Sequence, residues 1–448
     1  MLTLKRRYWQ WMQRRELIRW SRSLHATGVE PMASEPGASR CTAAFVAEEF
    51  FHRDLRGFGG FGKVVSSIAS RANRQIAGPC RFGMILPQAV PSVDRVELRR
   101  YHDTPVVLRP SSGSLREHLG AYWQAITSLA PQALITIDWH PSYLVPLLAM
   151  PTTPVLVWIR DPRDSQAWTR LAEVPGEVES RGLSSRRDLI GLAREKQQSL
   201  DLLMRESRRG GRKVIFCSKS AALVQRARDT YGLPTLQPHL LPTPLDAPAE
   251  PGLYEQIAER PTLLFLGRLD PVKRPWVAFE IAARHPELQV LVAGAFPNAS
   301  TTAPWQARYA RLPNLQLLGH VDGAEKDRLL RSCWALVNTS AHEAEPVSFL
   351  EAFSYGKPVI ACHADEDNVR RFGYYAGPSS GAGLDEASLI RFDTAITQML
   401  GDAAQRRRKG ESARDFVLQN HSHEAFYSAL MRIYRSEGIA ETASVFTA

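Results

Sequence analysis

The chain has 448 residues, of which 44% are hydrophobic and 23% are charged, and its formal net charge is +10. This length allows two domains with separate cores, and the composition is that of a globular protein rather than a fibrous or disordered one. No run approaches the roughly 18 to 20 apolar residues that span a bilayer. The N-terminus also lacks an apolar signal core. We therefore expect a cytoplasmic protein, with a peripheral membrane location as the alternative.

The five cysteines are scattered singly, without the close pairs of a zinc site or redox motif. We therefore expect reduced thiols and no metal site built on them. The positive net charge favours anionic partners, but it fits nucleotide sugars, acidic lipids and nucleic acids equally well. Charge alone does not choose among these partners.

The N-terminal segment is strongly basic, with arginines and lysines interleaved with aromatic residues over positions 1–22. A helical apolar face in this segment would be interrupted by Arg15 and Arg22, so its amphipathicity is poor. We expect a solvated basic extension, with a peripheral membrane helix as the alternative. Residues 27–40 are rich in Gly, Pro, Ser and Ala, which is typical of a linker. Together, residues 1–40 form the predicted extension and linker.

Strands and helices alternate over residues 41–240, which indicates a doubly wound parallel sheet. Predicted strands cover residues 43–48, 133–137, 155–159 and 213–218, and predicted helices cover 63–73 and 219–231. A proline-rich segment, 238–251, then makes a stiff connection to a second domain, 241–415. Its predicted strands are 263–266, 288–293, 315–318, 335–338 and 359–362, with a helix over 276–284. Residues 387–437 read as helical, and we assign 416–448 to a final helix and tail.

The pattern over residues 342–361 predicts a loop, a helix, a helix end and a short strand. Pro346 suits the first helical position, and Gly356 ends the helix. Glu343 precedes the helix and Glu351 lies inside it. The first amides of such a helix are free to bind an anion. This stretch therefore predicts a phosphate cradle with carboxylates beside it.

A second polar motif follows the first strand of the second domain. Gly267 ends the strand, so Arg268 stands at the carboxyl edge of the sheet, and Lys273 follows in the turn before a helix. Ligands of open parallel sheets bind at this edge. Two cations so placed can neutralise a diphosphate.

Two glutamates eight positions apart, followed by Glu-Ala-Phe-x-x-Gly-x-Pro-Val-Ile-Ala, resemble the signature of the retaining glycosyltransferases of family 4. The resemblance covers most of residues 41–437 and is strongest over 262–361. It implies the GT-B fold, in which two Rossmann-like domains face each other across a cleft and a C-terminal helix crosses back to the first domain. It also implies retaining transfer from a nucleotide-sugar donor to a glycan, lipid-linked or small-molecule acceptor.

The resemblance also implies roles for individual residues. Glu343 corresponds to the glutamate beside the donor sugar, and Arg268 and Lys273 correspond to the cations that grip the diphosphate. Glu351 corresponds to the residue that holds the ribose. The expected donor-binding set is Glu351, Gly267, Val347, Ser348, Phe349, Gly59 and Gly60, of which the two glycines match a pair that opens the first helix of the N-terminal domain. Because cations and helix amides already offset the diphosphate, we expect no metal and no cofactor besides the nucleotide-sugar co-substrate.

The chain departs from the family pattern at two places. Glu345-Pro346 stands where the family has a small pair, which adds a negative charge near the donor. Arg160 and Asp161 stand where family members commonly have a histidine, and we place them, with His140, on the acceptor side. We interpret Asp365-x-Asp367 as a loop rather than a metal site.

The departures keep two other functions open, a catalytically inactive binding protein of the same fold and a nucleotide-sugar epimerase or hydrolase. The expected partners are the nucleotide-sugar donor and a glycan or lipid-linked acceptor. A membrane surface that binds the basic N-terminus remains an alternative partner, and we expect no nucleic acid.

Overall fold

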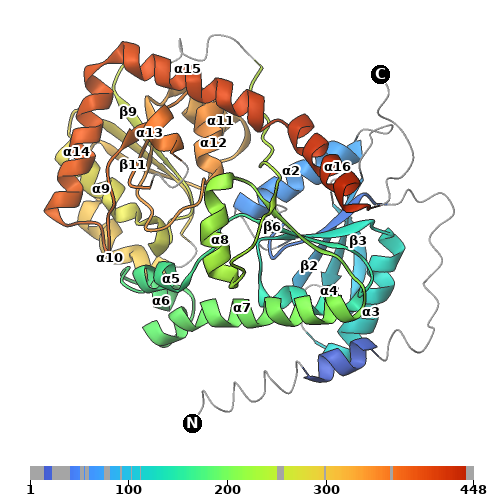
Figure 1. The fold of residues 1–448 in the computed structure, drawn as a ribbon. Helices are drawn as coiled ribbons and strands as arrows, with labels where there is room; N and C mark the ends of the chain where they lie inside the picture. The colour runs from blue at the N-terminus through green and yellow to red at the C-terminus, as the bar shows by residue number, and fades with distance from the viewer. Residues whose placement is uncertain are drawn as a thin grey trace.

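Two β-sheets, one in each half of the chain, form the framework of the computed structural model (Figure 1). The structure describes residues 15–22, 41–50, 55, 60–74, 81–90, 93–101, 103–110, 112–249, 257–296, 299–363 and 367–439. Both sheets are covered by helices on their two faces, as the alternating sequence pattern predicts for α/β domains.

The first sheet has the strand order β3-β4-β2-β1-β5-β6-β7-β8, and all neighbours are parallel except β3 and β4. Its strands are β1 (Ala43–Val46), β2 (Phe82–Ala89), β3 (Glu97–Tyr101), β4 (Thr104–Arg109), β5 (Ala133–Ile137), β6 (Val155–Ile159), β7 (Val214–Ser218) and β8 (His239–Leu240). Strands β1, β5 and β6 are buried along their whole length. Continuous apolar strands of this kind need helices on both faces of the sheet.

Two sets of helices cover this first sheet. One face packs against α2 (Gly60–Arg74) and α16 (His423–Glu437). The other face packs against α3 (Leu115–Leu129), α4 (Leu144–Ala149), α7 (Arg186–Arg209) and α8 (Val224–Tyr231). Two short helices, α5 (Ser165–Leu171) and α6 (Glu177–Ser180), follow β6 and lead into α7.

The second sheet is parallel throughout and has the order β11-β10-β9-β12-β13-β14. Its strands are β9 (Thr262–Leu266), β10 (Gln289–Ala293), β11 (Leu315–Gly319), β12 (Ala335–Asn338), β13 (Val359–Ala361) and β14 (Tyr374–Tyr375). One face carries α9 (Pro275–Arg284), α10 (Ala299–Tyr309) and α14 (Glu386–Gly401). The other carries α11 (Gly323–Ser332), α12 (Val347–Ser354), α13 (Asn368–Phe372) and α15 (Ala403–Asn420).

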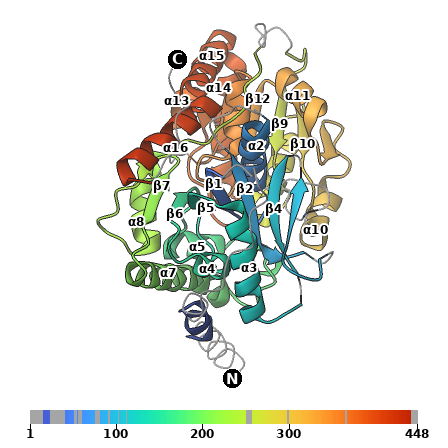
Figure 2. The ribbon, with the colours of Figure 1, turned by 90° about the vertical axis from the view of Figure 1, so that its right-hand side faces the viewer.

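The last helix, α16, returns to the first domain, as Figures 1 and 2 show. Phe426 and Leu430 of α16 are buried in the core of the first sheet. The Tyr434 hydroxyl donates to the Thr42 carbonyl at 2.8 Å, and the Tyr427 hydroxyl donates to the Ile68 carbonyl at 3.2 Å. The predicted crossing of the C-terminal helix is confirmed.

The N-terminal segment differs from the expected solvated extension. Residues 15–22 form a helix that lies against α4 and α7, at the N-terminal end of the ribbon in Figures 1 and 2. Leu17 is buried in the core of the first domain, and the Ser21 hydroxyl donates to the Leu148 carbonyl at 2.7 Å. Arg22 forms a two-pronged ion pair with Glu206. The expectation of a solvated segment is therefore wrong for residues 15–22, and residues 1–14 lie outside the described part.

Some element boundaries also differ from the sequence prediction. Strands β2, β3 and β4 were not predicted, because Pro87 and the charged edge strand β3 break the apolar pattern. Helix α2 begins at Gly60 rather than residue 63, and Pro346 is the N-cap of α12 rather than its first helical residue. Among the described residues, no helix combines the length and the apolar character needed to cross a membrane.

Candidate active site

A cleft of about 1450 Å³ lies between the two domains. Its walls include residues that directly follow the strands of both sheets: Asp138 after β5, Arg160 after β6, Gly267 after β9, Gly294 after β10 and Asn338 at the end of β12. Open parallel sheets bind ligands at their carboxyl edges. The two sheets therefore present their binding edges to one shared space.

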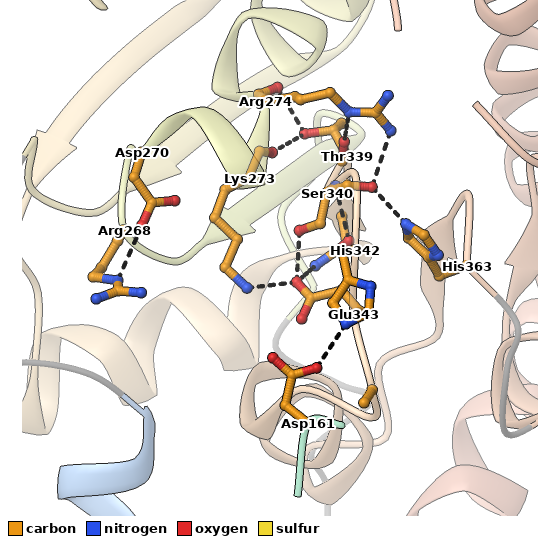
Figure 3. A network of polar contacts seen from close by, with 12 residues as sticks. Asp161, Arg268, Asp270, Lys273, Arg274, Thr339, Ser340, His342, Glu343 and His363 are labelled. Carbon is orange, nitrogen blue, oxygen red and sulfur yellow. Dashed lines mark hydrogen bonds and ion pairs between the residues drawn. The ribbon is translucent and has the colours of Figure 1, made fainter. Parts of the chain in front are cut away.

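Glu343 lies in this cleft and is only 7% exposed. Its Oε1 accepts hydrogen bonds from Lys273 Nζ at 2.6 Å, Ser340 Oγ at 2.5 Å and Asn338 Nδ2 at 3.1 Å (Figure 3). Burial opposes ionisation, but the Lys273 charge and the three hydrogen bonds outweigh it and lower the pKa of Glu343. The carboxylate is therefore ionised and fixed in position at neutral pH.

The turn that carries Lys273 is fixed by its neighbour Arg274. Arg274 is fully buried and adopts a φ of 47°, which is unusual for a residue other than glycine. Its guanidinium donates to the Thr339 carbonyl at 2.7 Å and to the Ser340 carbonyl at 2.9 Å (Figure 3). The loop after β9 and the loop after β12 are thus joined, which places Lys273 against Glu343.

Arg268 is about half exposed and reaches into the cleft. Its Nε lies 3.3 Å from Asp270 Oδ2, and its Nη1 lies 3.8 Å from Glu49 Oε1 in the first domain. The nearby Gly294 has to be a glycine, because a Cβ there would lie 1.8 Å from the Gly267 carbonyl oxygen. Close packing of the two strand ends leaves this part of the cleft open to a ligand.

Two helices begin opposite each other in the cleft. Helix α12 starts at Val347, and a Cβ added to Gly60, the first residue of α2, would lie 3.5 Å from Val347 Cγ2. Val347, Ser348 and Gly60 line the cleft. The first amides of a helix have no partner within the helix and carry partial positive charge. Pro346 supplies no side-chain cap to α12, so these amides are available to an anion.

Glu351 binds two lysines, one from each domain. Its Oε1 accepts from Lys326 Nζ of α11 at 2.8 Å and from Lys63 Nζ of α2. Burial opposes ionisation of Glu351, but the two lysines outweigh it and lower its pKa. The site therefore contains two lysines, Lys63 and Lys326, that the sequence analysis did not single out.

Other contacts cross the cleft beside Glu343. His342 Nε2 lies 2.7 Å from Asp161 Oδ1 of the first domain (Figure 3). Arg163 binds the other oxygen of Asp161 at 2.5 Å. Lys219 of the first domain donates to the Ala344 carbonyl and, at 2.7 Å, to the Glu345 carbonyl. The first domain thus fixes the loop that carries Glu343 from two sides.

The structure gathers most of the predicted site residues around the cleft. Those that line it are Glu343, Arg268, Lys273, Glu351, Gly267, Val347, Ser348, Gly60, His140, Arg160 and Asp161. Phe349 is an exception and a correction, because its side chain lies in the core and its N–H donates to the Pro346 carbonyl at 2.9 Å. Gly59 and Asp365 lie outside the described residues.

His140 is tied to its own domain. Its Nδ1 lies 2.8 Å from Ser142 Oγ and 2.8 Å from Glu48 Oε1, and its ring accepts from the Ser142 amide as the cap of a short turn. Its ring lines the cleft and is 41% exposed. The cap contacts orient the ring toward the first-domain side of the cleft.

Sequence reasoning missed Lys63, Lys326, Asn338 and His342. Lys63 follows the glycine loop in the first turn of α2, and Asn338 ends a strand, so both positions carried a signal. The contact of His342 with Asp161 joins residues 181 positions apart and has no local signature.

Known proteins resemble this chain in sequence or in fold. Residues 254–416 match the sequence family described as "Glycosyl transferases group 1". No curated protein matches the chain.

Several solved structures share the whole two-domain arrangement. Sucrose-phosphate synthase from Thermosynechococcus elongatus is 15% identical with a TM-score of 0.62, and the match covers 89% of this chain and 99% of that one. A glycosyltransferase from Rickettsia africae ESF-5 is 13% identical with a TM-score of 0.61, covering 90% and 100%. Anabaena HepE, solved in complex with UDP and glucose, is 13% identical with a TM-score of 0.58, covering 89% and 100%. The chain thus has the GT-B fold of these glycosyltransferases, and residues 254–416, most of its second domain, match the glycosyl transferases group 1 family.

Proposed function

We propose that this protein transfers a sugar from a nucleotide-sugar donor to an acceptor hydroxyl, with retention of the anomeric configuration. The observation that carries the proposal is the ionised Glu343 carboxylate, held against Lys273 at the start of α12 in the cleft between the domains. The family match of the second domain and the GT-B fold support a glycosyl-transfer function. HepE of Anabaena, with the same fold, was solved with UDP and glucose and also with UDP-glucose.

The donor diphosphate fits where positive groups converge. Arg268, Lys273 and the first amides of α12 all face one part of the cleft. As the bond between the sugar and the diphosphate breaks, negative charge grows on the departing phosphate oxygen. Fixed positive groups at that point stabilise the transition state more than the bound donor, which accelerates the reaction.

Glu343 then acts on the sugar. Its ionised carboxylate accepts hydrogen bonds from sugar hydroxyls and stabilises the positive charge that develops at the anomeric carbon. The acceptor oxygen attacks the anomeric carbon on the face from which the diphosphate leaves. The new carbon–oxygen bond forms as the bond to the phosphate oxygen breaks, and the acceptor proton passes to that phosphate oxygen. The sugar therefore keeps its anomeric configuration.

The first test is binding of a donor panel. Thermal unfolding should be followed with UDP-glucose, GDP-mannose, ADP-glucose and the free nucleotides, and we expect one nucleotide series to raise the melting temperature. Arg268→Met and Lys273→Met should reduce that shift, because each removes a cation from the diphosphate site. Arg328→Met, on the exposed side of α11 and outside the cleft, is the matched control. No stabilisation by any nucleotide would contradict the proposed function.

A further inference from the structure

Arg160 and Glu345 are two buried charged side chains on opposite walls of the cleft, and both have unused hydrogen-bonding atoms. Arg160 is 1% exposed and Glu345 is 7% exposed. Within the described part of the chain, Arg160 Nε and Nη1 have no hydrogen-bond partner, and neither has Glu345 Oε2. Buried polar groups in proteins are nearly always paired, because an unpaired one loses its hydrogen bonds to water without replacement. Unpaired donors and an unpaired acceptor beside one cavity point to a ligand.

The two side chains are fixed where they are. The Arg160 guanidinium lies against the rings of Trp158 and Phe61, with its carbon 4.6 and 5.4 Å from their centres. Glu345 has a φ of 43°, and Asn368 Nδ2 donates to its Oε1 at 2.9 Å. Lys219 binds the Glu345 carbonyl at 2.7 Å. No hydrogen bond joins Arg160 to Glu345, so neither side chain pairs with the unpaired atoms of the other. Their opposite charges nevertheless interact.

Arg160 and Glu345 lie near the position proposed for the transferred sugar. Glu345 lies two residues after Glu343 on the same loop, and Arg160 directly follows β6 on the facing wall. Pro346 has no N–H, so the loop offers no amide donor at that position. The Glu345 carboxylate is therefore a polar group that this loop presents next to the place where Glu343 would hold the sugar.

The pair of charges restricts the kind of group that can bind between them. A carboxylate or phosphate bound between the two side chains would be repelled by Glu345, and an ammonium group would be repelled by Arg160. A pair of neutral hydroxyls suits both, because one O–H donates to Glu345 Oε2 and an oxygen accepts from Arg160 Nε or Nη1. Buried hydrogen bonds of this kind discriminate strongly against a ligand that lacks the hydroxyl.

We infer that Arg160 and Glu345 form a subsite that binds hydroxyl groups of the neutral sugar on the donor and so helps to select that sugar. This inference rests on the proposed function. It assigns a binding role to Glu345, which the sequence showed only as a departure from the family pattern, and it moves Arg160 from the expected acceptor side to the donor sugar.

The test compares the donor with its own nucleotide. Dissociation constants for UDP-glucose and UDP are measured by calorimetry for the wild type, Glu345→Gln and Arg160→Met, or for GDP-mannose and GDP, or ADP-glucose and ADP, if that pair binds instead. We expect each variant to bind the nucleotide sugar about tenfold or more weakly, the usual effect of losing a charged hydrogen bond. Binding of the free nucleotide should stay within about twofold. Arg170→Met, at an exposed position of α5, and Glu173→Gln, at an exposed position just after α5, lie outside the cleft and are matched controls.

Each other outcome has a definite meaning. Unchanged affinity for the nucleotide sugar, or equal loss of affinity for the free nucleotide, would overturn the inference and leave the proposed function standing. Slower transfer at unchanged donor affinity would also overturn it, because the pair would then act on the acceptor. If the wild type binds none of the nucleotide sugars, the proposed function fails first and the inference fails with it. If Arg160→Met does not fold, Arg160→Lys and the isosteric Glu345→Gln take its place in the test.

Discussion

Glu343 and Glu351 lie eight residues apart and occupy very different surroundings. Glu343 has one lysine and two neutral donors around it, in the loop before α12. Glu351 lies within α12, and its carboxylate forms ion pairs with Lys63 and Lys326. Under the proposed function, the first carboxylate would bind the sugar and the second the nucleoside, where a ribose hydroxyl would take the place of a lysine hydrogen bond.

This difference separates the two residues kinetically. Glu343→Gln should lower kcat by about 10² to 10³, or ~3 to 4 kcal/mol, because it removes charge stabilisation that matters only in the transition state. Glu351→Gln should chiefly raise the KM of the donor. Steady-state kinetics with varied donor, together with the dissociation constant of the free nucleotide, separate the two effects.

Glu325→Gln, in the exposed first turn of α11, is the control for these two variants. The reverse pattern, with Glu343→Gln weakening nucleotide binding and Glu351→Gln lowering only kcat, would show that α12 is wrongly placed against the donor.

At this scale the sequence indicated the residue types but not their contacts. Arg268, Lys273 and Glu343 were recognisable because each stands after a strand or before a helix, and Glu351 because it lies eight positions after Glu343 in the motif. The pairing of Lys273 with Glu343 joins positions 70 residues apart, and it depends on the buried Arg274 joining two loops. Such contacts follow from the packing of the whole sheet, which local spacing does not encode.

Among the elements, the N-terminal helix is the clearest case of tertiary structure overriding local pattern. Its arginines interrupt any apolar face, yet Leu17 is buried in the core, and Ile18 and Trp20 pack against it. Ser21 and Arg22 bind α4 and α7. The segment is therefore a packed part of the first domain over residues 15–22. Any role of its basic residues at a membrane would have to leave this packing in place.

Leu17→Ala should destabilise the protein by about 2 kcal/mol, because it removes a buried side chain from an otherwise filled core. Thermal unfolding measures the loss, and Arg19→Ala, at an exposed position of the same helix, should leave the melting temperature unchanged. Equal melting temperatures for the two variants would show that the helix does not stay packed in solution.

Most buried strands were predictable because parallel strands covered on both faces are continuous apolar runs. The hairpin of β3 and β4 was not, because β3 is an exposed edge strand with the sequence Glu-Leu-Arg-Arg-Tyr. Strand β2 contains Pro87, and its pairing with β4 shifts register there. Edge strands and interrupted strands are stabilised by their neighbours rather than by their own pattern.

For the whole molecule, the hydrogen bond between Asp161 and His342 is one of the contacts that join the two domains across the cleft. Burial opposes ionisation of Asp161, but Arg163 and His342 outweigh it and hold its pKa well below the ordinary 3.8. A carboxyl whose folded pKa is depressed stabilises the fold above the unfolded pKa, and this contribution is lost as pH falls through the folded value.

We therefore expect the melting temperature of the wild type to exceed that of Asp161→Asn at pH 7, and the gap to narrow as pH falls below about 4. Asp201→Asn, at an exposed position of α7, should show no such gap. If the difference in melting temperature between the wild type and Asp161→Asn is the same at pH 7 and pH 3, the Asp161 charge does not stabilise the fold.

The whole cleft is lined by positive groups of the protein, which include Arg268 and Lys273. If these cations and the first amides of α12 bind the donor diphosphate as proposed, turnover should be unchanged by EDTA. Activity should be measured in EDTA and again after addition of Mg²⁺ or Mn²⁺. Loss of activity in EDTA that either ion restores would contradict this expectation and redirect attention to the Asp365-x-Asp367 segment.

We propose that the cleft breaks the bond between sugar and diphosphate and keeps the anomeric configuration. A proton NMR time course tests this with the wild type and Glu343→Gln, the nucleotide sugar that stabilises the protein most, and water as the first acceptor. We expect the wild type to consume the donor, the first sugar released to have the anomeric configuration of the donor, and Glu343→Gln to be slower by at least a hundredfold. An unchanged donor, an epimerised donor, or a first product of the opposite anomeric configuration would contradict it.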